Sequence, residues 1–155
     1  MKSQIVGVIS DTHGLFRDEI REVFSGCSFI IHAGDVGTPS VLWELERIAG
    51  VKAVRGNIDR GDWAADLKES EFLLIGSSRI YVVHDLKSSA LSVPAAAVDV
   101  VVYGHSHRPG IVYRSETLYL NPGSAGPRRF DLPVSVALMR IGEDGVFPEI
   151  VELAA

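Results

Sequence analysis

The sequence predicts an α/β protein with mixed β-sheets, and three observations support this fold class. In the first half, short apolar runs typical of buried strands alternate with amphipathic stretches, which is the pattern of parallel βαβ units. In the second half, strands come in pairs with turn residues between them, which is the pattern of antiparallel hairpins. The length of 155 residues suits one domain, so we expect residues 1–155 to form a single unit with a sizeable core.

Three strands and two helices are expected in the first half. The strands lie at 5–9, 29–31 and 51–54, where the residues are mostly apolar. A helix is predicted over 15–25, because apolar residues recur there at helical spacing and Gly26 is a natural end. The second helix begins at Thr38-Pro39, where a capping side chain precedes a proline in the first turn, and it ends at Gly50.

The second half is predicted to consist mostly of strands. The expected hairpins pair 71–75 with 79–84, 111–114 with 117–120, and 134–140 with 146–152. A strongly buried strand is expected over 98–103, and the segment 88–97 is expected to begin as a helix that Pro94 interrupts.

Composition indicates an ordinary soluble protein of a reducing compartment. Hydrophobic residues make up 46% and charged residues 23%, and no apolar run approaches the roughly 20 residues that span a membrane. The single cysteine, Cys27, excludes an internal disulfide and is expected in the core, and no secretory signal is visible. We therefore expect a cytoplasmic protein without membrane contact. The net charge of -5 argues against stable nucleic-acid binding, although bound cations can still attract a phosphorylated substrate.

Five apolar strands each run directly into polar residues that can bind a metal. Because ligands collect outside the carboxyl ends of strands in α/β proteins, these side chains are expected to meet at one rim. Four of the five histidines belong to the set, so a separate structural explanation for each of them would be a coincidence. The mixture of carboxylate, amide and imidazole without thiolate suits two borderline-hard cations. The set comprises Asp11, His13, Asp35, Asn57, His84, His105 and His107.

The spacing within this set leaves the ligand arrangement open. A carboxylate such as Asp35 can bridge two ions, whereas Asn57 offers a neutral carbonyl oxygen. The two members of Asp11-Thr12-His13 lie two residues apart, so in an extended segment they reach the same side, while in a loop they can reach different ions. The same holds for His105-Ser106-His107.

These motifs, in this order, resemble the motif series of the calcineurin-like metallophosphoesterases. The resemblance rests on Asp11-Thr12-His13, Gly34-Asp35, Gly56-Asn57-Ile58-Asp59, His84 and Gly104-His105-Ser106-His107. Asn121-Pro122-Gly123-Ser124 resembles the segment that follows in the small bacterial and archaeal phosphodiesterase branch. The resemblance implies a four-layer αββα sandwich of two mixed β-sheets flanked by helices.

The resemblance also implies an activity and a ligand assignment. Asp11, His13, Asp35 and His107 would hold one ion, and Asp35, Asn57, His84 and His105 would hold the other, with Asp35 as the bridge. Phosphate esters, with phosphodiesters first, would be hydrolysed by a hydroxide that bridges the two divalent ions. Mn²⁺ is the first expectation, with Zn²⁺, Fe²⁺, Ni²⁺ or Mg²⁺ as alternatives. The expected partner is a small phosphorylated substrate, and self-association into a homo-oligomer is left open.

Two positions depart from the family pattern. Many relatives have a histidine, taken to protonate the leaving group, where this chain has Ile58. Asp59 remains as a candidate for orienting or shuttling a proton, with a turn residue as the alternative, and we take Asp59 and His105 as the candidate catalytic residues. The small phosphodiesterases usually show His-Gly-His where this chain has His84-Asp85-Leu86, so Asp85 places an extra carboxylate beside the metals.

Other residues and functions carry weaker signals. His32 is expected to be a packed, hydrogen-bonded histidine, while Arg55, Arg60, Arg128 and Arg129 are candidates for contact with phosphate oxygens. The main alternative function is a non-catalytic protein-interaction scaffold like the retromer subunits, which share the fold but tend to lose metal ligands. Because this chain keeps all seven, the enzyme is favoured. Nuclease action is disfavoured by the acidic charge balance.

Overall fold

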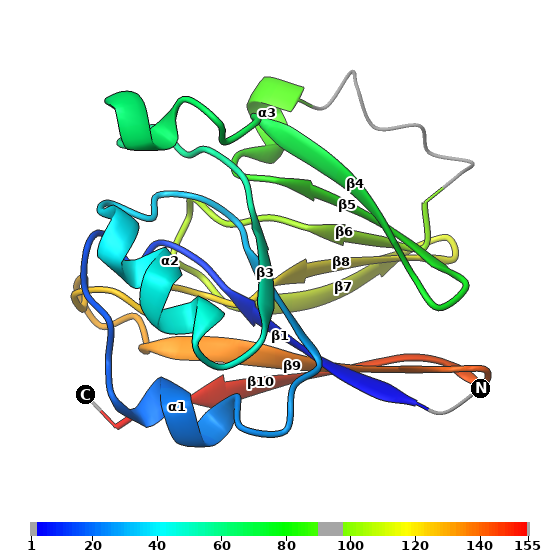
Figure 1. Ribbon diagram of the computed structural model, residues 1–155. Helices are drawn as coiled ribbons and strands as arrows, with labels where there is room; N and C mark the ends of the chain where they lie inside the picture. Colours follow the sequence, from blue (N-terminus) through cyan, green and yellow to red (C-terminus); the bar gives the residue numbers. More distant parts are fainter. Residues whose placement is uncertain (1–2, 90–97, 155) are drawn as a thin grey trace.

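The computed structural model describes residues 3–89 and 98–154, and two five-stranded sheets stacked face to face form its framework (Figure 1). The first sheet has the order β10 (Gly145–Glu152), β9 (Ser135–Gly142), β1 (Gln4–Ile9), β2 (Phe29–His32) and β3 (Gly50–Ala53). The second has the order β4 (Ser70–Ile75), β5 (Ser78–Val83), β6 (Val100–Val102), β8 (Thr117–Asn121) and β7 (Gly110–Arg114).

Both sheets are mixed, as the sequence predicts. Strands β1, β2 and β3 run parallel, and β9 and β10 continue this sheet with antiparallel pairs. In the second sheet β5, β6 and β8 are parallel, whereas β4 and β7 pair antiparallel at the two edges. All three expected hairpins are present, as β4–β5, β7–β8 and β9–β10.

Helices cover the first sheet more fully than the second. Helices α1 (Glu19–Val23) and α2 (Pro39–Glu46) lie against its outer side (Figure 1). Their buried residues Ile20, Val41 and Leu45 pack in one cluster with Ile30 of β2 and Val136 of β9. In the described part of the chain, the second sheet is accompanied by the short α3 (Leu86–Ser89), and a 3₁₀ turn, η1 (Asp62–Ala64), precedes β4. The sandwich is therefore confirmed, with thin helical layers.

Helix boundaries differ from the expected ones. Helix α1 begins at Glu19 rather than at residue 15, because His13 and Gly14 have φ angles of 48° and 84°, which continue a loop. Helix α2 ends at Glu46, before the expected end. Of the helix expected over 88–97, residues 90–97 lie outside the described residues.

The main core lies between the two sheets. Apolar side chains from both sheets form one cluster that includes Val8, Ile31, Ile80, Val100 and Met139, all fully buried. Burying each such side chain contributes about 1.5–3 kcal/mol. This shared core fixes the sheets relative to each other, so the strand ends that carry the polar motifs meet at the seam between them.

Cys27 packs in the cluster beneath α1 and α2, where burial raises the pKa of its thiol to about 11, as suits a core residue. Among the described residues, the structure contains no helix with the length and apolar character needed to cross a bilayer.

Candidate metal centre

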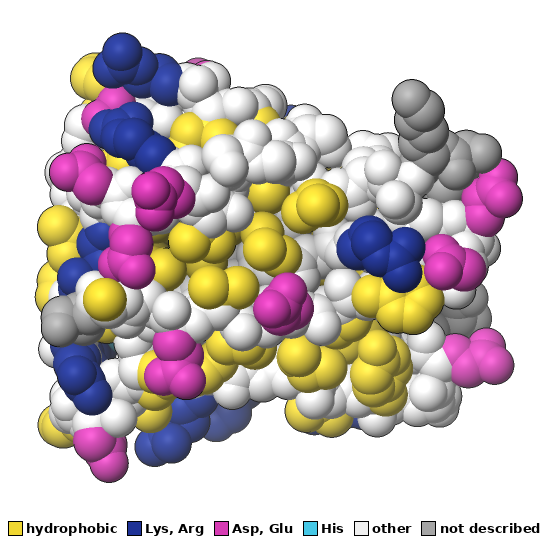
Figure 2. All heavy atoms as spheres, turned by 90° about the horizontal axis from the view of Figure 1, so that it is seen from below, with side chains coloured by type: hydrophobic (Ala, Val, Ile, Leu, Met, Phe, Trp, Pro, Cys, Tyr) yellow, Lys and Arg dark blue, Asp and Glu magenta, His cyan; other side chains and the backbone are white. Residues whose placement is uncertain are grey.

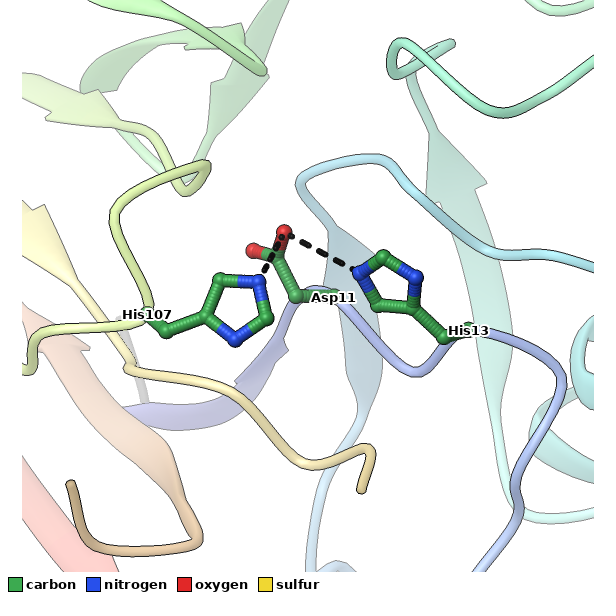
Figure 3. Close-up of side chains that lie close together, drawn as sticks. All are labelled: Asp11, His13 and His107. Carbon is green, nitrogen blue, oxygen red and sulfur yellow. Dashed lines mark ion pairs between the residues drawn. The ribbon is translucent and has the colours of Figure 1, made fainter. Parts of the chain in front are cut away.

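Five of the seven predicted ligands converge where the two sheets meet, and no histidine side chain is visible on the face of the molecule that Figure 2 shows. The Oδ1 atom of Asp11 lies 3.3 Å from Nε2 of His107 and 3.9 Å from Nε2 of His13 (Figure 3). The Oδ2 atom of Asp35 lies 3.3 Å from Nε2 of His84 and 3.6 Å from Nε2 of His13. Asp11 Oδ1 is also 3.8 Å from His84 Nε2, so the two carboxylates stand between imidazoles that come from opposite sheets.

These atoms form two overlapping groups that can hold cations. One group is Asp11, His13 and His107, the other is Asp11, Asp35 and His84, and within each group the ligand atoms lie within 4.8 Å of one another. Three of the atoms that face each other, Asp11 Oδ1, His13 Nε2 and His84 Nε2, are buried without a hydrogen-bond partner. An unsatisfied buried polar group costs about 1–3 kcal/mol, so this donor set fits divalent ions that would coordinate it.

A backbone contact orients His84 toward the two carboxylates. Its Nδ1 lies 2.8 Å from the carbonyl oxygen of Ala33, and an N–H there donates to the carbonyl and leaves the lone pair of Nε2 facing Asp11 and Asp35. Burial works against the charged imidazole, but Asp35 and Asp11 outweigh it and raise the pKa of His84.

Asp11 is held as a carboxylate. Burial opposes its charge, but the imidazoles of His107, His13 and His84 close to it lower the pKa of Asp11 well below its usual range. Its second oxygen, Oδ2, accepts hydrogen bonds from Ser10 Oγ at 2.5 Å and from the backbone N–H of His105 at 3.1 Å. An ionised carboxylate is the form that binds a metal.

The remaining two predicted ligands lie at the outer side of the cluster. The ring of His105 meets that of His84 edge to face, with centroids 5.3 Å apart, and its side chain is about half exposed at 48%. Asn57 is exposed and lines a pocket of about 250 Å³ together with His84. The assignment of four ligands to each ion therefore stays a prediction.

The backbone of this site is strained. Seven non-glycine residues of the described chain have positive φ, and five of them are predicted ligands. Each such conformation costs on the order of 1–3 kcal/mol and persists where the surroundings fix it, commonly at functional sites. The five are Asp11 at 56°, His13 at 48°, Asp35 at 56°, His105 at 73° and His107 at 64°.

Glycines allow the ligand-bearing loops to approach each other. A Cβ atom on Gly56 would collide with the backbone nitrogen and Oδ1 of Asp35, and one on Gly104 would lie 2.6 Å from Asp11 Oδ2. The loops after β2 and β3, and those after β1 and β6, therefore contact each other at positions without a side chain.

His32 is a buried structural histidine, as the sequence predicts. Its Nδ1 accepts the backbone N–H of Gly34 at 3.1 Å, so Nε2 carries the proton and donates to Thr12 Oγ1 at 3.0 Å. The Thr12 hydroxyl donates in turn to the carbonyl of Val36 at 2.8 Å. Complete burial lowers the pKa of His32 to about 4, so it is neutral at physiological pH.

Asp59 supports the loops around the site. Its Oδ2 accepts the backbone N–H groups of Gly56 at 2.8 Å and Val36 at 3.2 Å, and its Oδ1 accepts that of Gly37 at 2.9 Å. These bonds join the loop after β3 to the loop after β2. The proton-transfer role of Asp59 stays a prediction, and its hydrogen bonds give it a positioning role that the sequence did not reveal.

Asn121 is a second supporting residue that sequence reasoning placed only within a motif. Its buried amide donates to the carbonyl of Gly104 and to Ser106 Oγ, both at 3.2 Å. Ser124 Oγ donates to the carbonyl of Asp11 at 3.0 Å. The end of β8 and the residues that follow it thus hold both the Asp11 loop and the loop of His105 and His107, and the motif resemblance of residues 121–124 was the signal in the sequence.

The fold and the site together define a class of protein. The family model of the calcineurin-like phosphoesterase superfamily domain matches residues 5–144, and the chain belongs to this superfamily. A probable metallophosphoesterase of Methanothermobacter thermautotrophicus is 33% identical, covering 97% of this chain and 94% of that protein. A phosphodiesterase of Methanocaldococcus jannaschii is 28% identical, over 76% of this chain and 82% of its own length.

Solved structures show the same fold. A conserved Streptococcus pneumoniae protein, described as a predicted phosphoesterase, matches with a TM-score of 0.72 at 25% identity, covering 99% of both chains. Vacuolar protein sorting 29 of Cryptosporidium parvum matches with a TM-score of 0.78 at 20% identity, also over 99% of both chains. The second likeness concerns the fold alone.

Proposed function

We propose that this protein is a metal-dependent phosphodiesterase with a binuclear centre. The observation that carries the proposal is the set of buried ligand atoms without hydrogen-bond partners that face one another around Asp11 and Asp35. Each of these carboxylates lies within 4 Å of more than one imidazole, as expected of residues that serve neighbouring ions. The phosphoesterase relatives support the same reaction class.

The protein contributes rigid placement of charge. Two bound divalent ions would lower the pKa of a water and neutralise the phosphoryl oxygens of an ester. Asp11 and Asp35 would hold both ions, while the hydrogen bond from His84 to Ala33 fixes one imidazole in its ligating orientation. Preorganisation of this kind costs no rearrangement during the reaction.

Phosphodiesters with a good leaving group are the substrates that this site favours. Ile58 stands where many relatives carry a proton-donating histidine, and its partly exposed side chain has no proton to give. General-acid assistance is typically worth about 10²–10⁴-fold in rate, so esters of weakly acidic alcohols should react slowly.

The test compares a diester and a monoester with the same leaving group. Protein loaded with Mn²⁺ should hydrolyse bis(p-nitrophenyl) phosphate faster than p-nitrophenyl phosphate, and Asp35→Asn and His107→Gln should abolish both activities. The matched control is Glu149→Gln, which replaces an exposed carboxylate on β10 and should be fully active. If the metal-loaded protein cleaves neither ester above the buffer rate, the proposal fails.

A scaffold without catalysis is the competing function, because vacuolar protein sorting 29 shares the fold. Hydrolysis separates the two better than metal content, because Vps29 of Entamoeba histolytica has been solved in complex with zinc. An enzyme of the proposed kind hydrolyses the diester once it is loaded with metal, whereas a scaffold that binds metal leaves the ester intact.

A further inference from the structure

A charged pocket adjoins the metal centre. It has a volume of about 250 Å³, and its wall includes the predicted ligands Asn57 and His84 together with Arg55, Glu69 and Asp85. A neighbouring pocket of about 430 Å³ shares Arg55, Asn57 and Glu69 with it. Because two predicted metal ligands form part of its wall, the pocket lies where an ester group of a metal-bound phosphodiester would extend.

The pocket carries more negative than positive charge. The guanidinium of Arg55 lies 3.4 Å from a carboxylate oxygen of Glu69, so these two charges largely offset each other. Asp85 is a second carboxylate in the same wall. Among its own lining side chains, one cation and two anions leave the pocket wall with one excess negative charge, counted apart from the ions that the neighbouring ligands would hold.

The carboxylate of Asp85 is fixed in position. Its Oδ1 accepts the backbone N–H of Lys87 at 3.1 Å, which is the bond of a helix-capping residue before α3. Its Oδ2 lies 3.8 Å from Nε2 of His105, and the side chain is only 26% exposed. The negative charge is therefore held at the edge of the site and partly shielded from water.

We propose that Asp85 is a specificity-determining residue that makes the enzyme prefer phosphodiesters whose alcohol group carries a positive charge, such as an ammonium-bearing alcohol. The inference rests on the proposed function. A fixed, partly buried carboxylate attracts a cation in the pocket and repels an anionic ester group, and the effect weakens as salt screens it. Allowing for partial exposure, we expect a preference on the order of tenfold.

The test uses two esters of the same shape that differ in one charge. One is p-nitrophenyl phosphorylcholine and the other is p-nitrophenyl 3,3-dimethylbutyl phosphate, in which carbon replaces the quaternary nitrogen. Binding is measured separately by calorimetry on metal-loaded protein with phosphorylcholine and 3,3-dimethylbutyl phosphate. The variants Asp85→Asn and Asp85→Ser remove the charge and keep a capping side chain, and Glu149→Gln removes an exposed charge on β10.

Wild type and Glu149→Gln should prefer the ammonium compounds about tenfold in kcat/KM and in Kd, and 1 M salt should reduce this preference. Both Asp85 variants should treat the paired compounds alike at every salt concentration. Equal treatment by wild type, or a preference that survives in Asp85→Asn and Asp85→Ser, overturns the inference. If no diester is hydrolysed, the proposed function fails, while the calorimetry still decides the charge preference.

Discussion

A single methyl group at Gly56 is expected to disrupt the metal centre. The Cβ of alanine at this position would collide with the backbone nitrogen and Oδ1 of Asp35 and would lie 2.9 Å from its Cα, whereas ordinary contacts begin at 3.4 Å. Relief of the contact with Cα alone would separate the loops after β2 and β3 by about 0.5 Å, and the closer contacts with the nitrogen and Oδ1 require more than this, which exceeds the roughly 0.5 Å within which functional groups must be held. Backbone atoms cannot swing aside as a flexible side chain can, so the strain falls on Asp35.

Two quantities should change in Gly56→Ala. Overpacking of this kind typically costs about 1–3 kcal/mol in the free energy of unfolding. Displacement of Asp35 should weaken metal binding about 10–100-fold, as disturbance of the supports around metal ligands commonly does. Urea denaturation of the metal-free protein measures the first quantity, and titration calorimetry with Mn²⁺ measures the second.

Gly110→Ala is the matched control, because a Cβ on Gly110 meets no atom within 4 Å. It should leave metal affinity unchanged and alter stability by less than about 1 kcal/mol. If Gly56→Ala binds Mn²⁺ as tightly as Gly110→Ala and unfolds at the same urea concentration, the close approach of Gly56 to Asp35 does not hold the metal centre together.

Three further predictions concern stability. Asp59→Asn turns an amide N–H₂ toward backbone N–H groups that now donate hydrogen bonds to the carboxylate. The free energy of unfolding, measured by urea denaturation, should therefore fall by about 1–3 kcal/mol, and an unchanged midpoint would contradict this positioning role. The pKa of His32 is about 4 in the folded protein, compared with 6.5 for an ordinary histidine, so the unfolded chain binds the proton more tightly than the folded one. The free energy of unfolding of the metal-free protein should therefore fall by up to about 3 kcal/mol as the pH falls from 6.5 to 4. His32→Gln should lose less stability over this range, and parallel pH profiles of the two proteins would refute the assignment to His32. Mn²⁺ at 100 times its Kd should raise the free energy of unfolding by about 2.7 kcal/mol per site, which a thermal melt shows as a higher Tm. His84→Ala should reduce this rise in Tm, and an equal rise in that variant would count against the site.

The strands were predictable because their signals are local. Runs such as Val100–Val102 are apolar throughout and need no knowledge of their neighbours, and the hairpins are marked by turn residues such as those around Gly76. The start of α1 was not predictable in this way. Leu15 and Phe16 fit the helical spacing, but His13 and Gly14 follow a loop whose path is set by contact with the loop after β2.

The candidate ligands were identifiable from their position after strands, while their supports were not. The role of Asp59 depends on backbone N–H groups more than twenty residues away, and the role of Asn121 depends on the loop of Gly104. Positive φ at Asp35 and His107 is also invisible in sequence, because aspartate and histidine tolerate it better than most residues but adopt it at few of their positions, and the surrounding loops decide where.

A shared metal centre at Asp11 and Asp35 is tested most directly by a Mn²⁺ titration of metal-free protein that follows bound metal, the electron paramagnetic resonance spectrum and hydrolysis of bis(p-nitrophenyl) phosphate together. We expect two ions per chain, a spectrum of a spin-coupled pair, and activity that reaches its plateau at the second equivalent. Asp35→Asn should lose the coupled signal and the activity together. Saturation at one ion or none, or two ions without a coupled signal and without diester hydrolysis, would contradict a shared centre at Asp11 and Asp35.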